Sequence, residues 1–246
     1  MKKISKKAES RLKMTFYVLL LVGWATAALL GAEFLVALLT FWLVSDGGIN
    51  STVLNASMST IAYLLAAFLI IWVPAKLHKI NFVKSTRERL GLRDFPTWTD
   101  IGLAPVGYIV MLLIAMGLTA IFKTFPWFEA GQAQELGYSL YMQGWERGLA
   151  FVELVIIAPI IEELIFRGWL YGNLRLKIPK PLAILIVSLL FGLVHMQWNV
   201  GISVFAISLV NCLLREVTGT IYAGTLMHML NNGIAFYLVY VAGFGA

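Results

Sequence analysis

The chain of 246 residues is 60% hydrophobic, only 13% charged and has a net charge of +6. Soluble globular domains contain about 25% charged residues, so this composition excludes an ordinary soluble protein. The mean hydropathy of +0.83 and apolar stretches of the roughly 20 residues that cross a bilayer predict an all-α polytopic membrane bundle. The basic residues lie between these stretches, which argues against nucleic acid as a partner. The single cysteine excludes a disulfide framework.

Seven apolar segments follow one another along the chain and predict seven transmembrane helices, within a single membrane domain over 1–246. They are residues 14–44, 53–75, 101–122, 147–174, 181–197, 200–214 and 217–243. The first is long enough to cross the membrane twice, so eight helices is the alternative. This first segment also continues far beyond the roughly 7–15 apolar residues of a signal peptide. We interpret it as an uncleaved first span.

Lysine and arginine are concentrated in alternate connecting segments. Those segments are the N-terminus and the connections after the second, fourth and sixth spans, whereas the other connections hold only Lys123 and Arg147. Because cytoplasmic loops are rich in Lys and Arg, this alternation predicts a cytoplasmic N-terminus. Residues 76–100 interleave basic and apolar side chains, and we interpret them as an amphipathic connector on the cytoplasmic surface.

A few ionisable side chains lie inside the apolar segments, where each costs about 2.5–3.5 kcal/mol on insertion scales and is a candidate for function. They are Glu33, Glu153, Glu162, Glu163, Arg167, His195 and His228. In straight helices, Glu162, His195 and His228 lie roughly 20, 21 and 18 Å from the basic ends of their segments. Three helices would therefore bring one carboxylate and two imidazoles to the same depth, which is the minimum condition for a common site.

The spacing within the fourth span separates the two adjacent carboxylates. Glu163 and Arg167 are four residues apart and can form an ion pair along one helix face. Glu162 is turned by about 100° from Glu163 and faces another neighbour. Pro159 lacks a backbone donor and clashes with the Val155 carbonyl, which predicts a kink or a hydrated pocket.

Each of these features taken alone has a structural explanation, such as an ion pair that locks two helices or an interhelical hydrogen bond of a histidine. His228 and Asn232 are four residues apart and could be such polar contacts. We assign Glu33 and Glu153 to packing, because Glu153 is nine residues before Glu162 and faces the opposite side of a regular helix. The combination at one depth nevertheless favours a functional site.

Three short motifs of the chain, in this order, resemble those of the CPBP family, which comprises CAAX-type prenyl endopeptidases and bacteriocin-processing or immunity (Abi) proteins. The motifs are EExxxR in "EELIFR" (162–167), FxxxH in "FGLVH" (191–195) and HxxxN in "HMLNN" (228–232). The stretch "RERLGLRDFPTWTDIG" also resembles the connector of bacterial members. The resemblance divides the domain into N-terminal spans with the basic connector, 1–84, and a CPBP-like catalytic core, 85–246.

The resemblance implies an intramembrane endopeptidase of a bacterial or archaeal plasma membrane. It implies that Glu162 and His195 activate water and that His228 and Asn232 stabilise the oxyanion, with Glu163 in support. Arg167 is implied as a second supporting residue. A carboxylate and an imidazole can act together as a general base, and fixed donors stabilise a tetrahedral intermediate. The implied partners are the bilayer and a membrane-embedded or lipidated substrate, of CAAX type or a leader or bacteriocin peptide.

Zinc is an alternative to a cofactor-free mechanism. Glu162, His195 and His228 could supply three ligands, with water as the fourth. If Glu163 is tied to Arg167, however, no carboxylate would remain as the base. We therefore favour a metal-free glutamate mechanism and expect no cofactor.

Two other classes of function remain open. A non-catalytic immunity or binding protein of the same family would sequester a peptide or toxin and would need the polar residues only for folding. A proton-coupled transporter would also place Glu and His in a membrane, but transporters usually show internal repeats. Here the polar layer is confined to the C-terminal half of the chain, which counts against transport.

Overall fold

The computed structural model describes residues 6–44, 50–77, 87–93, 95–132 and 136–244, and these residues form helices and connecting loops without a strand. The elements are α1 (Lys6–Val44), α2 (Ser51–Ala67), η1 (Phe68–Trp72), α3 (Val73–Leu77), α4 (Arg87–Arg89), α5 (Trp98–Phe122), α6 (Gly144–Phe151), η3 (Val152–Ile157), α7 (Ala158–Glu163), η4 (Leu164–Tyr171), α8 (Gly172–Leu174), α9 (Lys180–Leu193), α10 (Trp198–Thr218), α11 (Tyr222–Phe236) and η5 (Tyr237–Val241). Those labelled η are π-helical. The all-α prediction is therefore confirmed for the described residues.

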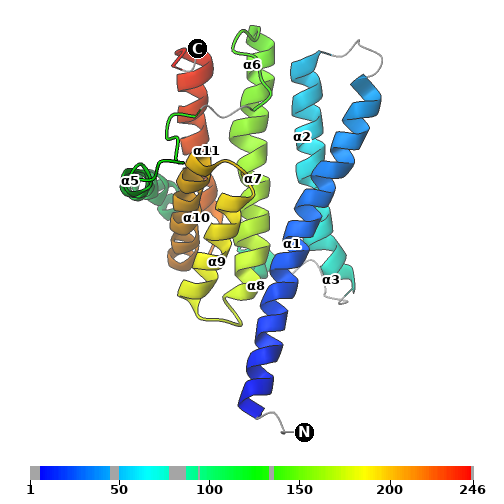
Figure 1. The fold of residues 1–246 in the computed structure, drawn as a ribbon, viewed down its shortest axis with the longest axis vertical. Helices are drawn as coiled ribbons and strands as arrows, with labels where there is room; N and C mark the ends of the chain where they lie inside the picture. Colours follow the sequence, from blue (N-terminus) through cyan, green and yellow to red (C-terminus); the bar gives the residue numbers. More distant parts are fainter. Residues whose placement is uncertain (1–5, 45–49, 78–86, 94, 133–135, 245–246) are drawn as a thin grey trace.

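The first apolar segment is one continuous helix, α1, and does not turn back to cross the bundle twice. The chain then reverses into α2, whose first turn is capped by Asn50; its side chain accepts hydrogen bonds from the backbone N–H groups of Thr52 and Val53. α1 and α2 pack against each other. They form the right-hand side of the molecule in Figure 1.

The centre of the bundle is a long helical column formed by α6, η3, α7, η4 and α8 in succession. In Figure 1 this column stands between the α1–α2 pair and the group α9, α10 and α11. It packs against α2 on one side and against α9, α10 and α11 on the other. Side chains of the column can therefore reach both halves of the chain.

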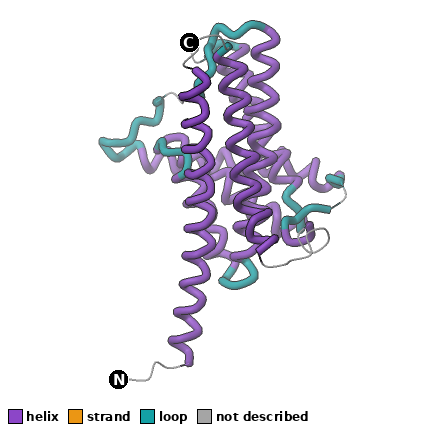
Figure 2. The backbone as a smooth tube through the Cα atoms, turned by 90° about the vertical axis from the view of Figure 1, so that its right-hand side faces the viewer, coloured by secondary structure: helices purple, strands orange, loops and turns teal. Residues whose placement is uncertain are grey.

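Helix α5 lies crosswise to the column. It is seen end-on in Figure 1, and Figure 2 shows a helix running crosswise through the middle of the molecule. Its first turn is fixed by a capping box between Thr97 and Asp100. The Asp100 side chain, which is 1% exposed, also accepts a hydrogen bond from Thr220 Oγ1 at 2.9 Å. This contact ties the start of α5 to the loop between α10 and α11.

Helices α9 and α10 form a tight hairpin whose connecting turn carries His195. The backbones meet at Gly192 and Gly201: a Cβ atom on Gly192 would lie 2.8 Å from the Gly201 carbonyl oxygen. Only glycine permits this approach, because side-chain carbons do not come so close to backbone oxygen. The crossing fixes the position of the turn and therefore of His195.

Four described helices are long and apolar enough to cross a membrane: Lys7–Trp42, Ser51–Leu77, Trp98–Phe122 and Trp198–Thr218. This is fewer than the seven or eight that the apolar segments predict. The central column, 144–174, is not among these four, and it carries six charged side chains. The number of spans therefore stays a prediction.

The ends of the bundle agree with the alternation of basic segments. In Figure 1 the N-terminus, α3 and α8 lie toward the lower end, and the C-terminus lies at the upper end. Lys76 of α3 and Arg175, which follows α8, are therefore at the same end as the basic N-terminal segment. Which end is cytoplasmic stays a prediction, and ten of the 25 residues of the predicted connector 76–100, namely 78–86 and 94, lie outside the described residues.

Candidate active site

The central column is widened by two π-helical segments, and Pro159 accounts for the first. The Ala158 N–H donates to the carbonyl of Glu153, five residues earlier, as in a π-helix. If this π-helical pattern continued by one residue, the Leu154 carbonyl would accept a hydrogen bond from the backbone N–H of residue 159. Residue 159 is a proline, which has no N–H. That carbonyl accepts instead from Asn232 Nδ2 at 3.0 Å. Pro159 thus creates a backbone acceptor that a side chain of α11 satisfies.

This geometry corrects two expectations. The carbonyl that Pro159 leaves without a backbone donor is that of Leu154 rather than that of Val155, because the helix is already π-helical before the proline. The wider turns also change the helix phase, so Glu153 faces α2 as Glu162 does. Glu153 Oε1 accepts a hydrogen bond from Ser59 at 2.6 Å. The prediction that Glu153 faces away from Glu162 was wrong, because it assumed 3.6 residues per turn throughout.

Glu163 is the buried centre of a polar cluster formed by the central column, α10 and α11. Its side chain and that of Arg167 are 0% exposed, and Arg167 NH1 lies 2.9 Å from Glu163 Oε1, with the distance of an ion pair but not the alignment of a hydrogen bond. The same oxygen accepts from Asn211 Nδ2 at 2.8 Å and from His228 Nδ1 at 3.1 Å. The expected Glu163–Arg167 pair is confirmed, and it is joined by donors from α10 and α11.

Glu162 faces a different set of partners, as its turn on the helix predicts. Its Oε1 accepts a hydrogen bond from the Tyr63 hydroxyl at 2.7 Å. Its Oε2 lies 3.7 Å from His228 Nε2, which is beyond hydrogen-bond length. His228 is thus placed between the two carboxylates, with Nδ1 on Glu163 and Nε2 toward Glu162.

His195 is at the end of the α9–α10 turn and is half-buried. Its Nδ1 donates to the Phe191 carbonyl at 2.8 Å, so Nε2 is the nitrogen that can accept a proton. Among the described residues, Glu162 bonds to Tyr63 and His195 bonds to Phe191, and no direct hydrogen bond joins Glu162 to His195. Both imidazoles pack edge-on against the buried Phe191 ring, with centroid distances of 5.1 Å for His195 and 5.9 Å for His228. Phe191 is therefore the common support of the two histidines.

Arg167 also packs on the Phe191 ring. Its guanidinium carbon lies 4.3 Å from the centroid of Phe191, within the range of a cation–π contact. Glu163 and the ring together hold the buried charge. The arginine of the first motif and the phenylalanine of the second thus touch each other.

Among the described residues, no three His, Cys, Asp or Glu side chains converge into a group that could hold a metal ion, Glu162, His195 and His228 included. The Nδ1 atoms of the two histidines are hydrogen-bonded to the Phe191 carbonyl and to Glu163. Each Nε2 atom is therefore the nitrogen that could act as a metal ligand. The metal-free mechanism stays a prediction.

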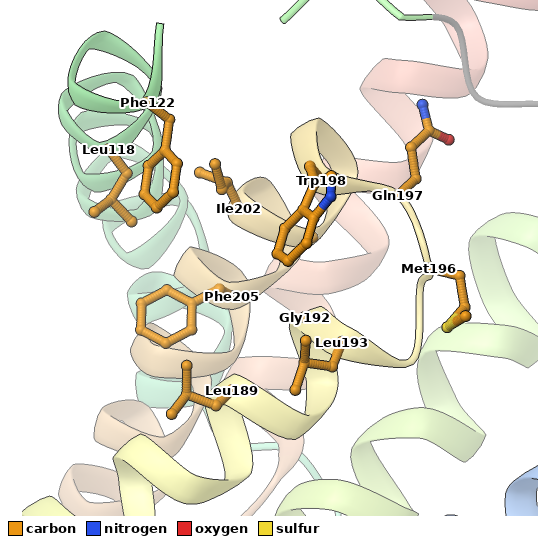
Figure 3. Close-up of a pocket in the computed structure, with 11 residues that line it drawn as sticks. Leu118, Phe122, Leu189, Gly192, Leu193, Met196, Gln197, Trp198, Ile202 and Phe205 are labelled. Atoms are coloured by element: carbon orange, nitrogen blue, oxygen red, sulfur yellow. The ribbon is translucent and has the colours of Figure 1, made fainter. Parts of the chain in front are cut away.

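An apolar pocket of about 510 Å³ lies beside the turn that follows His195. Figure 3 shows Phe122 of α5, Leu189 of α9 and Phe205 of α10 pointing into it, while Met196 lies on the turn. None of the polar site residues lines this pocket. It could accept an apolar group but supplies no chemistry itself.

Sequence reasoning missed three residues of the cluster. Tyr63 and Asn211 were overlooked because only ionisable side chains were counted, although an asparagine within an apolar span is equally unusual. Phe191 was noted only as a motif letter. The first two could have been found by including every polar side chain that lies within an apolar segment.

Asn232 has a structural task that can be separated from any catalytic one. We expect Asn232→Leu to lower the free energy of unfolding by about 1–3 kcal/mol, because it leaves the Leu154 carbonyl unpaired. The measurement is denaturant unfolding of the purified protein in detergent. Adding Pro159→Ala supplies a backbone N–H for that carbonyl and should restore stability.

The matched control is Asn231→Leu, which removes the neighbouring amide but leaves the bond to the Leu154 carbonyl in place. We expect it to unfold like the wild type. Equal destabilisation by both variants, or no recovery on adding Pro159→Ala, would contradict this assignment. A double variant that is stable but inactive would assign Asn232 a second role in the reaction.

Comparison with known proteins gives one match. Residues 144–234 match the family model of type II CAAX prenyl endopeptidases, described as Rce1-like. No curated protein and no solved structure matches the chain. The matched segment begins at the first residue of α6 and ends within α11, so it contains all three motifs. Residues 144–234 are therefore similar to the type II CAAX prenyl endopeptidase Rce1-like domain, which is consistent with the CPBP family and with a membrane endopeptidase.

Proposed function

We propose that this protein hydrolyses a peptide bond of a membrane-embedded or lipidated protein or peptide, using water activated by Glu162 and no metal ion. One observation supports this most directly. Glu162 has one oxygen fixed by Tyr63, while the other lies 3.7 Å from His228 without a hydrogen bond to it. That second oxygen is free to take a proton.

In the proposed reaction, the carboxylate of Glu162 removes a proton from water as the water oxygen bonds to the carbonyl carbon. His195 accepts a hydrogen bond from the same water through Nε2, because its Nδ1 already donates to the Phe191 carbonyl. The protonated Glu162 then gives its proton to the leaving amine as the carbon–nitrogen bond breaks. A positioned general base of this kind contributes about 10²–10⁴-fold to the rate.

The oxyanion of the tetrahedral intermediate needs donors on the opposite side. We assign this role to His228 and Asn232. Asn232 uses one N–H for the Leu154 carbonyl and retains a second. His228 uses Nδ1 for its contact with Glu163, so the nitrogen that it offers to the oxyanion is Nε2.

The supporting residues act on His228 rather than on the substrate. Glu163 fixes the orientation of the imidazole through Nδ1, and Arg167 with Asn211 fixes Glu163. The apolar pocket beside the His195 turn fits the hydrocarbon part of a substrate held in a bilayer. We propose that the chain is a multi-pass protein of a prokaryotic plasma membrane.

The test compares membranes of cells that produce the wild type or Glu162→Gln by quantitative proteomics. A precursor that accumulates only with Glu162→Gln is the expected result, and it would identify the substrate. Cleavage of that precursor by the purified protein should continue in a strong chelator. Loss of cleavage that added zinc restores would contradict the metal-free mechanism.

A non-catalytic peptide-binding or immunity protein is the second candidate, and one observation favours it. Glu162, His195, Asn211 and His228 each have a hydrogen-bond partner within the fold, and among the described residues no hydrogen bond joins Glu162 to His195. A protein of this kind would protect cells equally well with Glu162→Gln, and no precursor would accumulate.

A further inference from the structure

Helix α2 presents a row of polar side chains to the segment before α6 and to the central column. Asn55, Ser59 and Tyr63 are spaced four residues apart and therefore share one helix face. Asn55 donates to the Gly137 carbonyl, and Ser59 donates to Glu153 at 2.6 Å. Tyr63 is the last of the row and the only one that reaches a residue of the candidate active site.

The hydrogen bond from the Tyr63 hydroxyl makes the two carboxylate oxygens of Glu162 inequivalent. Its proton points at Oε1 over 2.7 Å, so Oε1 is held and Oε2 is left toward His228. A carboxylate that can rotate freely would present either oxygen in many directions. The phenol therefore restricts the base to one orientation, and it does so from a helix outside the matched segment 144–234.

Tyr63 also borders a cavity of about 430 Å³ between α1 and α2. Glu33 and Ser59 line the same cavity, and Tyr63 interacts electrostatically with Glu33, Glu153 and Glu162. The phenol has one proton to donate and three carboxylates around it. The hydroxyl donates that proton to Glu162, so the hydrogen bond is specific to one of the three carboxylates.

We propose that Tyr63 is a positioning residue that orients the Glu162 carboxylate for its reaction with water. This inference rests on the proposed function, because it assigns Glu162 as the base. It adds that the N-terminal helices, which carry none of the three motifs, complete the site. The α1–α2 pair would then be required for catalysis and not only for anchoring.

The test is Tyr63→Phe, which removes one hydroxyl oxygen and keeps the ring. We expect kcat for the precursor found with Glu162→Gln to fall about 10–100-fold with KM unchanged, as for a lost hydrogen bond to a charged group. Tyr138→Phe is the matched control, because Tyr138 donates to Glu153 at 3.3 Å and touches no candidate site residue. Burial and the nearby Glu153 raise the pKa of Tyr138, so it stays a donor.

A second readout separates this inference from the proposed function. The infrared carboxylate band that disappears in Glu162→Gln should shift in Tyr63→Phe and stay in place in Tyr138→Phe, whether or not the protein cleaves anything. An unshifted band, or equal losses of kcat in the two tyrosine variants, would overturn the positioning role. If the band shifts but the protein has no protease activity, the Tyr63–Glu162 contact is supported and the proposed function is refuted instead.

Discussion

Replacing Glu162 by glutamine is expected to lower kcat for peptide-bond hydrolysis by about 10²–10⁴-fold, the contribution of a positioned general base. The amide has the size of the carboxylate and can still accept from the Tyr63 hydroxyl, so the fold should persist. It cannot take a proton from water at neutral pH. Cleavage of the accumulated precursor by the purified protein, together with its thermal unfolding, measures both consequences.

Glu153→Gln is the matched control for this prediction. Glu153 is also a buried acid of the central column and also faces α2, but its partners are Ser59 and Tyr138 instead of His228. We expect its kcat to equal that of the wild type. Similar losses in the two variants would mean that both carboxylates serve the structure, and full activity of Glu162→Gln would remove Glu162 from the mechanism.

Replacing Arg167 by methionine is expected to lower the free energy of unfolding by about 3–5 kcal/mol, as when one partner of a buried ion pair is removed. Methionine fills most of the volume and still packs on Phe191. The change leaves Glu163, with a 0% exposed side chain, without its cation. Denaturant unfolding in detergent measures this decrease in the free energy of unfolding. The decrease should be larger than that expected from the removed packing contacts alone.

Two comparisons make this result specific to the ion pair. Adding Glu163→Gln to Arg167→Met removes the stranded charge and should recover part of the stability, since replacing both members of a buried pair costs less than breaking it. Lys13→Met breaks a pair with the same four-residue spacing on the surface, where the side chains are 76% and 56% exposed. Its stability should not change. A double variant less stable than Arg167→Met would contradict the account.

The comparison of sequence and structure is clearest in the central column. The charge and spacing of Glu163 and Arg167 are local properties of a helix, and their ion pair is present as expected. The phase between Glu153 and Glu162 was predicted wrongly, because it depends on π-helical turns. There, Pro159 leaves the Leu154 carbonyl without a backbone donor, and Asn232 donates to it instead, a contact across 78 residues of sequence.

The amino-acid sequence by itself determined the membrane class, the helical fold, the three motifs and the neighbours on one helix face, because composition and short-range periodicity control these properties. Only the tertiary structure decided that His228 lies between both carboxylates and that Phe191 supports both histidines. It also decided that Tyr63 reaches Glu162 across 99 residues. Contacts of this kind depend on how helices pack side by side, and the spacing of residues along one chain carries no information about that.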